Sequence, residues 1–133
     1  MIDDFKKKAK EWGLTVFIIE NTVELIKRNE KLTNAKRISY IIYLIGILIV
    51  FIQFLPNKNE LNSMTILFAS AALLVPFYIG AHFVESYQKS YKEQKTHLMK
   101  NISSGFCIHK TDCRCKDEYL VYMKDVQRIN LIY

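Results

Sequence analysis

Four residues with metal-binding or redox-active side chains lie close together near the C-terminus: Cys107, His109, Cys113 and Cys115. Thiolate and imidazole are the usual ligands of Zn²⁺ in proteins. Their spacing, C-x-H-x3-C-x-C, is not a common structural zinc pattern, and the single residue inside each pair predicts a cramped geometry. Two alternatives follow: a zinc site, or reduced thiols packed under a small helix. The spacing favours the thiols, so neither a metal nor another cofactor is expected.

The other residues that could do chemistry do not form a catalytic set. No carboxylate pair, nucleophile elbow or nucleophile beside a base occurs at a recognisable spacing in the sequence. His97 has no obvious partner along the chain and is expected to be an ordinary surface histidine. We therefore expect a protein that is not an enzyme.

Two long uncharged segments, residues 38–57 and residues 61–84, dominate the middle of the chain. A bilayer core about 30 Å thick needs a helix of about 20 apolar residues, and both segments reach that length. The alternative is two buried helices of a soluble domain, but 133 residues can hardly surround two helices that are apolar on every side. The sequence therefore predicts an all-α membrane protein with a two-helix transmembrane hairpin, whose first partner is the lipid bilayer.

Charge divides this chain into three parts. Of the 19 Lys and Arg residues, nine precede Ile38, nine follow Val84, and only Lys58 lies in the link between the apolar segments. The positive-inside rule then predicts that both termini are cytosolic. The expected parts are a cytosolic amphipathic helix (residues 1–37), the hairpin (residues 38–84), and a cytosolic helix with a Cys-containing tail (residues 85–133). Orientation and contacts with anionic lipid account for the net charge of +6 more simply than nucleic acid does.

Residues 1–37 carry apolar side chains spaced alternately three and four apart, which predicts one continuous helix. Gly13 should cost this helix about 1 kcal/mol relative to Ala without ending it. Three alternatives stay open: the helix packs on the cytosolic helix after the second span, self-associates as the core of a homo-oligomer, or lies in the membrane interface. The predicted oligomerisation residues are Phe5, Trp12, Val16, Ile19, Val23 and Ile26.

The first apolar segment has one face that is smaller and more polar than the rest. Its residues recur at helical spacing and are Ser39, Tyr43, Gly46, Val50 and Gln53. Such groups at membrane depth usually meet protein or water, so this face is predicted to line a pore or a helix interface, with Val50 as an apolar constriction. The second segment has a stripe of small residues and a proline: Thr65, Ala69, Ala72, Pro76 and Gly80. In the simpler alternative the two stripes pack on each other within one hairpin.

This layout resembles the small two-transmembrane effectors of bacterial anti-phage systems, the SLATT-type domains. The shared features are an amphipathic N-terminal helix ending in Lys36 and Arg37, two spans with a short link, and a long helix rich in Tyr, Lys and Glu. The resemblance implies an oligomeric ion channel in the bacterial cytoplasmic membrane, gated from the cytosol by an oligonucleotide or cyclic nucleotide made by a partner enzyme. The predicted anion-binding residues are Lys36, Arg37, Lys89 and Lys92.

Two other functions are compatible with a small, basic, helical membrane protein. One is a bacteriocin or toxin immunity protein. The other is a membrane-anchor subunit without channel activity.

Overall fold

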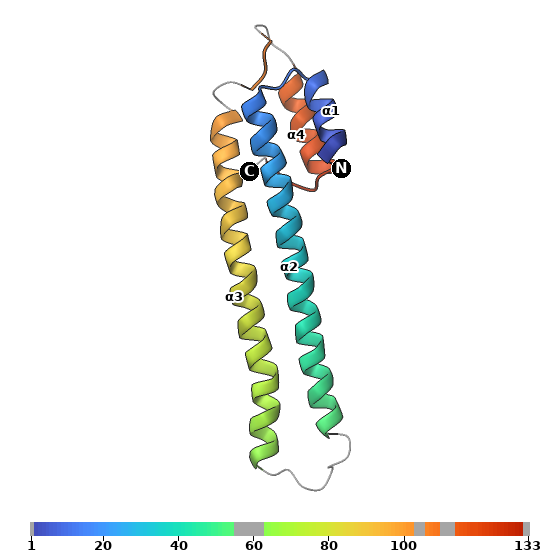
Figure 1. Ribbon diagram of the computed structural model, residues 1–133, viewed down its shortest axis with the longest axis vertical. Helices are drawn as coiled ribbons and strands as arrows, with labels where there is room; N and C mark the ends of the chain where they lie inside the picture. The colour runs from blue at the N-terminus through green and yellow to red at the C-terminus, as the bar shows by residue number, and fades with distance from the viewer. Residues whose placement is uncertain (1, 55–62, 103–105, 110–113, 132–133) are drawn as a thin grey trace. The chain divides into compact units, whose positions relative to one another are not determined.

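The computed structural model describes residues 2–54, 63–102, 106–109 and 114–131 (Figure 1). The described residues form four α-helices and no β-strand, which confirms the predicted all-α class. The helices are α1 (Ile2–Glu11), α2 (Val16–Phe54), α3 (Ser63–Ile102) and α4 (Cys115–Asp125). The chain divides into two compact units: a terminal unit, Met1–Glu30 with Lys89–Tyr133, and a hairpin unit, Lys31–Gln88. We describe each unit by itself.

The prediction of one continuous helix over residues 1–37 is wrong, because α1 and α2 are separate helices. Gly13 has a φ of 60°, in the left-handed region where only glycine is unstrained. Its N–H donates to the carbonyl of Lys10 (3.1 Å), and the N–H of Leu14 donates to that of Ala9 (3.0 Å). These bonds form a Schellman motif, a common helix C-terminus built around glycine. The three-and-four spacing therefore crosses a turn and does not describe one helix face.

The hairpin unit consists of two antiparallel helical segments, one from α2 and one from α3 (Figure 1). Most of its large apolar side chains are exposed, as at Leu48, Phe51 and Phe68. Both α2 and α3 contain a stretch long and apolar enough to cross a membrane, and only 11% of the residues in each apolar window are buried. These helices therefore differ from the core helices of a soluble protein, which bury such side chains.

The terminal unit has one packed core, to which α1, α4 and its portions of α2 and α3 all contribute. Phe5 of α1 lies against the rings of Tyr119 and Tyr122 of α4, with centroid distances of 6.4 and 6.1 Å. The buried residues of the core are Phe5, Ala9, Leu14, Ile18, Leu25, Ile26, Leu98, Ile102, Phe106, Tyr119, Tyr122, Met123, Ile129 and Leu131. The two ends of the chain, far apart in sequence, thus share one core.

Polar contacts join α2 and α3 within the terminal unit. The guanidinium of Arg28 donates from Nη1 to the Ser90 carbonyl (3.1 Å) and hydroxyl (2.9 Å). One helical turn and more away, the Gln94 amide donates to the Asn21 side-chain oxygen (3.1 Å). These contacts repeat along both helices and therefore fix their register in this unit.

A buried hydrogen bond connects α2 to α4 inside the core. The Thr22 hydroxyl donates to the carbonyl of Ile18 (2.7 Å), and its oxygen lies 2.8 Å from the Tyr119 hydroxyl. Because the single Thr22 proton goes to Ile18, Tyr119 is the donor of the second bond. Burial raises the pKa of Tyr119 above its usual value, so this hydroxyl stays protonated and able to donate.

We expect Thr22→Val to destabilise the terminal unit more than Tyr119→Phe. Thr22→Val leaves the buried Tyr119 hydroxyl without an acceptor, at a cost of about 1–3 kcal/mol, whereas Tyr119→Phe removes one hydrogen bond worth about 1 kcal/mol. The double variant should cost less than the sum, since no orphaned hydroxyl remains. Urea titrations of the detergent-solubilised protein, followed by Trp12 fluorescence, measure these differences. Equal effects of the two single variants would contradict the donor assignment.

Candidate functional site

Part of the predicted first-span face lies against the second span. Gly46 is buried, and a Cβ there would lie 2.8 Å from the Ala72 carbonyl oxygen and 3.5 Å from Pro76 Cγ. A Cβ at Gly80 would collide with the Ser39 hydroxyl. The backbones approach this closely only because positions 46 and 80 lack a side chain. At these positions the two small stripes pack on each other, as the simpler alternative expects.

Pro76 accounts for the carbonyl that α3 presents to this contact. A proline has no backbone N–H, so the oxygen of Ala72, four residues earlier, cannot accept its usual helical hydrogen bond. That oxygen instead faces Gly46, where the Cα–H groups are weak donors with no side chain in the way. The glycine on one helix and the proline on the other therefore complement each other.

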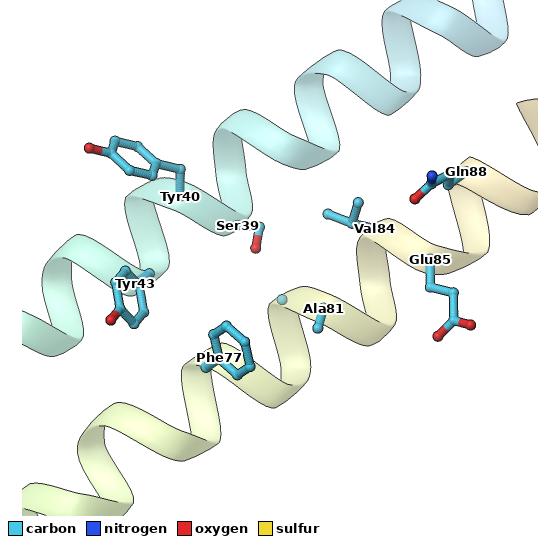
Figure 2. A pocket seen from close by; sticks show the side chains of 9 residues that line it. Ser39, Tyr40, Tyr43, Phe77, Ala81, Val84, Glu85 and Gln88 are labelled. Carbon is cyan, nitrogen blue, oxygen red and sulfur yellow. The ribbon is translucent and has the colours of Figure 1, made fainter.

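Ser39 and Tyr43 also line an open groove of about 470 Å³ between the two helices of the hairpin unit (Figure 2). Figure 2 shows Ser39 directed toward α3 and Tyr43 beside Phe77. The ring centroids of Tyr43 and Phe77 are 6.3 Å apart. Glu85 and Gln88 also belong to the lining, and Figure 2 shows the carboxylate of Glu85 directed away from α2. The groove thus combines aromatic walls with groups that can hydrogen-bond.

The rest of the predicted pore-lining face is less informative. Val50 is half-buried in the hairpin unit, and the side chain of Gln53 lies outside the described part of the structure. A pore lined by these residues stays a prediction.

The four residues predicted to bind an anion fall into two pairs. Lys36 and Arg37 belong to the hairpin unit, and Lys89 and Lys92 belong to the terminal unit. All four side chains are exposed and so accessible to a ligand. Binding of an anionic ligand by these residues stays a prediction.

Most of the predicted oligomerisation stripe packs inside its own chain. Phe5 and Ile26 are fully buried there, and three further residues, Trp12, Ile19 and Val23, are half-buried against the same core. Val16 is 71% exposed. Phe5 and Ile26 are therefore covered by their own chain, because the turn between α1 and α2 lets α1 pack on α4, and oligomerisation through the rest of the stripe stays a prediction.

The structure brings together three of the four Cys and His residues near the C-terminus. The ligand atoms of Cys107, His109 and Cys115 all lie within 4.8 Å of one another. Cys113 lies outside the described residues. The spacing argument against a site overlooked the backbone at residues 106–108, which pairs with the α1–α2 turn in a β-bridge. The chain bends at Ile108, and this bend lets the ligand atoms of Cys107 and His109 come together in spite of the short C-x-H spacing.

We expect Gly46→Val to separate the two spans, because a side chain there meets a backbone carbonyl that cannot move aside. Overpacking of this kind costs about 1–3 kcal/mol. A pair of cysteines replacing Tyr43 and Phe77, joined in membranes by a short bifunctional thiol reagent, reports on the contact. The cross-linked fraction should fall several-fold with Gly46→Val and stay unchanged with Ala71→Val, a matched control at an exposed position. Equal yields in both backgrounds would refute the close contact.

Comparison of this chain with protein-family models, with curated proteins and with solved structures finds no match. Function therefore has to follow from the residues and their geometry.

Proposed function

We propose that this chain is a two-span membrane protein whose hairpin unit holds the terminal unit at the cytosolic surface of a bacterial cytoplasmic membrane. In this function the hairpin is an anchor, and the terminal unit is the part that meets a cytosolic partner or signal. The observation that carries the proposal is the contrast in burial: the terminal unit encloses most of its large apolar side chains in a core, and the hairpin unit exposes most of its own.

The free energy of hydration supports a bilayer around the hairpin unit. Apolar surface left in water costs about 25 cal/mol per Å². Side chains such as Ile45, Leu48 and Phe77 are more than two-fifths exposed in the described hairpin. A lipid environment removes this cost, while the helices satisfy their own backbone hydrogen bonds, as a spanning segment must.

The positions of the charges support cytosolic termini. In the antiparallel hairpin unit, Ser39 lies opposite Gly80, so charged residues resume at a similar level on both helices, at Arg37 of α2 and Glu85 of α3. This level is where we expect the hairpin to leave the bilayer. Eighteen of the 19 basic residues then lie on one side, as the positive-inside rule requires of the cytosolic side.

Labelling of intact cells tests this topology. A cysteine introduced as Asn59→Cys should react with a membrane-impermeant thiol reagent from outside, because residue 59 belongs to the short link between the spans. The native cysteines should react only after the membrane is permeabilised in the presence of a zinc chelator, and they serve as the internal control. Labelling of native cysteines in intact cells, or protection of position 59, would reject the proposed orientation.

A second candidate function is an oligomeric, ion-conducting effector of phage defence, gated by a nucleotide. The groove favours it, because Ser39 and Tyr43 give one side of the hairpin hydroxyl groups that can hydrogen-bond. Polar groups at membrane depth usually face protein or water. The resemblance in layout to SLATT-type effectors supports the same function, with Lys36 and Arg37 near the cytosolic end to attract an anionic ligand.

Ion flux separates the two functions. In liposomes that carry the purified protein and a potential-sensitive dye, an anchor leaves the membrane potential intact, with or without added cyclic nucleotides. A pore dissipates it, and Val50→Ser should then speed dissipation at least severalfold by wetting an apolar constriction. Leu48→Ser is the matched control, since Leu48 is 57% exposed on the outer surface. Silence of wild type and Val50→Ser under all these conditions would exclude the pore.

A further inference from the structure

The terminal unit contains a cluster of three side chains of the kinds that bind metal ions, Cys107, His109 and Cys115, which we call the Cys–His cluster. Cys107 and Cys115 are half-buried and His109 is exposed, so an ion from solvent can reach the cluster. We propose that these three side chains bind one Zn²⁺ ion. This site is independent of the membrane function proposed above.

The separations within the cluster suit a tetrahedral ion. With Zn–S bonds of about 2.3 Å and Zn–N bonds of about 2.0–2.1 Å, neighbouring ligand atoms of a tetrahedral site lie roughly 3.5–3.8 Å apart. Cys115 Sγ lies 3.5 Å from His109 Nδ1, and all three ligand atoms lie within 4.8 Å of one another. Closing onto an ion therefore requires side-chain movements of about 1 Å or less.

The backbone holds two of the ligands in place before any ion arrives. The N–H of Ile108 donates to the carbonyl of Gly13 (3.0 Å), and the N–H of Thr15 donates to that of Phe106 (3.4 Å). These bonds pair the residues around Cys107 with the α1–α2 turn. A bend at Ile108 separates Cys107 from His109, and their ligand atoms lie within 4.8 Å of each other. A preorganised pair of ligands lowers the entropic cost of binding.

The α1–α2 turn also positions the His109 ring. A Cβ at residue 13 would lie only 3.0 Å from the Cε1 atom of His109 and 3.4 Å from its Nε2 atom. The imidazole thus packs directly on the backbone of Gly13, which leaves Nδ1 toward Cys115. The positive φ at residue 13 favours glycine, and the lack of a side chain there also leaves the space in which the His109 ring lies.

The third ligand comes from the start of a helix. Cys115 is the first residue of α4, where the helix dipole stabilises negative charge on its sulfur. A thiolate is the form that binds zinc. The donor set of two sulfurs and one imidazole nitrogen suits Zn²⁺ better than Mg²⁺ or Ca²⁺, which prefer oxygen ligands. Water or another group completes the tetrahedron.

The bound ion would cross-link two segments that the fold already brings together. It joins the start of α4 to residues 107–109, which are in turn hydrogen-bonded to the α1–α2 turn. The consequence is a terminal unit whose stability depends on zinc, because the unfolded chain does not hold the three ligands together.

Metal analysis of the full-length protein in detergent tests the site. Wild type should contain one zinc per chain by mass spectrometry, and Co²⁺ should replace it with the intense visible absorption of a tetrahedral thiolate complex. His109→Ala should lower the zinc affinity at least about tenfold. His97→Ala is the matched control, because His97 is also an exposed histidine of the terminal unit but lies outside the cluster. Cys113 stays in place in every variant.

A second measurement uses only the wild-type protein, so its outcome does not depend on whether a variant folds. Removing zinc from wild type with a chelator should expose Cys107 and Cys115 to alkylation, read by peptide mapping, and adding zinc back should protect both again. The proposal is overturned by wild type that binds no Co²⁺ or Zn²⁺, by equal affinities of His109→Ala and His97→Ala, or by alkylation that is the same with and without zinc.

Discussion

The left-handed turn at Gly13 is the constraint on which the terminal unit depends. It ends α1, and its Schellman bonds to Lys10 and Ala9 let the chain turn where a continuous helix would carry α1 away from α4. The same turn provides the carbonyl that holds Ile108. One backbone conformation therefore fixes both the helix that completes the core and the segment that carries two of the three clustered side chains.

A different physical effect organises the hairpin unit, in which few apolar side chains are buried. In the bilayer that we propose for this unit, no hydrophobic force drives two helices together, so close backbone contact and local polar complementarity have to supply the attraction. Gly46 and Gly80 let the two backbones come close together, and Pro76 leaves the carbonyl oxygen of Ala72 free to face Gly46. Burial of large side chains holds the terminal unit, and the absence of side chains holds the hairpin. This difference explains why, among the described residues, the packed core belongs to the terminal unit.

The sequence predicts the long-range features of this fold better than its local ones. The two long uncharged segments predict the two long helices, because their apolar character extends over many residues. The turn at Gly13 was missed because a spacing of three and four residues persisted across it, and the small average cost of a helical glycine gave no reason to stop. A glycine followed by an apolar Leu14 is also the signature of a helix C-terminus.

The contact between the ends of the chain could not be predicted, since no pattern within α1 specifies Tyr119 as its partner. Small residues at helical spacing indicated the interface between the spans, and the contact of Gly46 with Ala72 agrees with it. The Cys and His residues were recognised as ligand types, but their proximity depends on the bridge between residues 14 and 107. Pairing between residues so far apart in sequence leaves no periodic signal that a single chain can reveal.

Gly13 links metal binding to packing in the terminal unit. The residue that ends α1 also supports His109, so an ion held by His109 favours the conformation in which α1 lies on α4. An ion that binds only the folded form stabilises it by RT ln(1 + [Zn²⁺]/Kd), or about 2.7 kcal/mol at a hundred times Kd. Units smaller than about 70–80 residues seldom obtain more than about 3–5 kcal/mol from their core. The terminal unit is near this size. The stabilisation free energy from bound zinc is therefore comparable to the free energy that the core supplies, and it sets how firmly α1 is held.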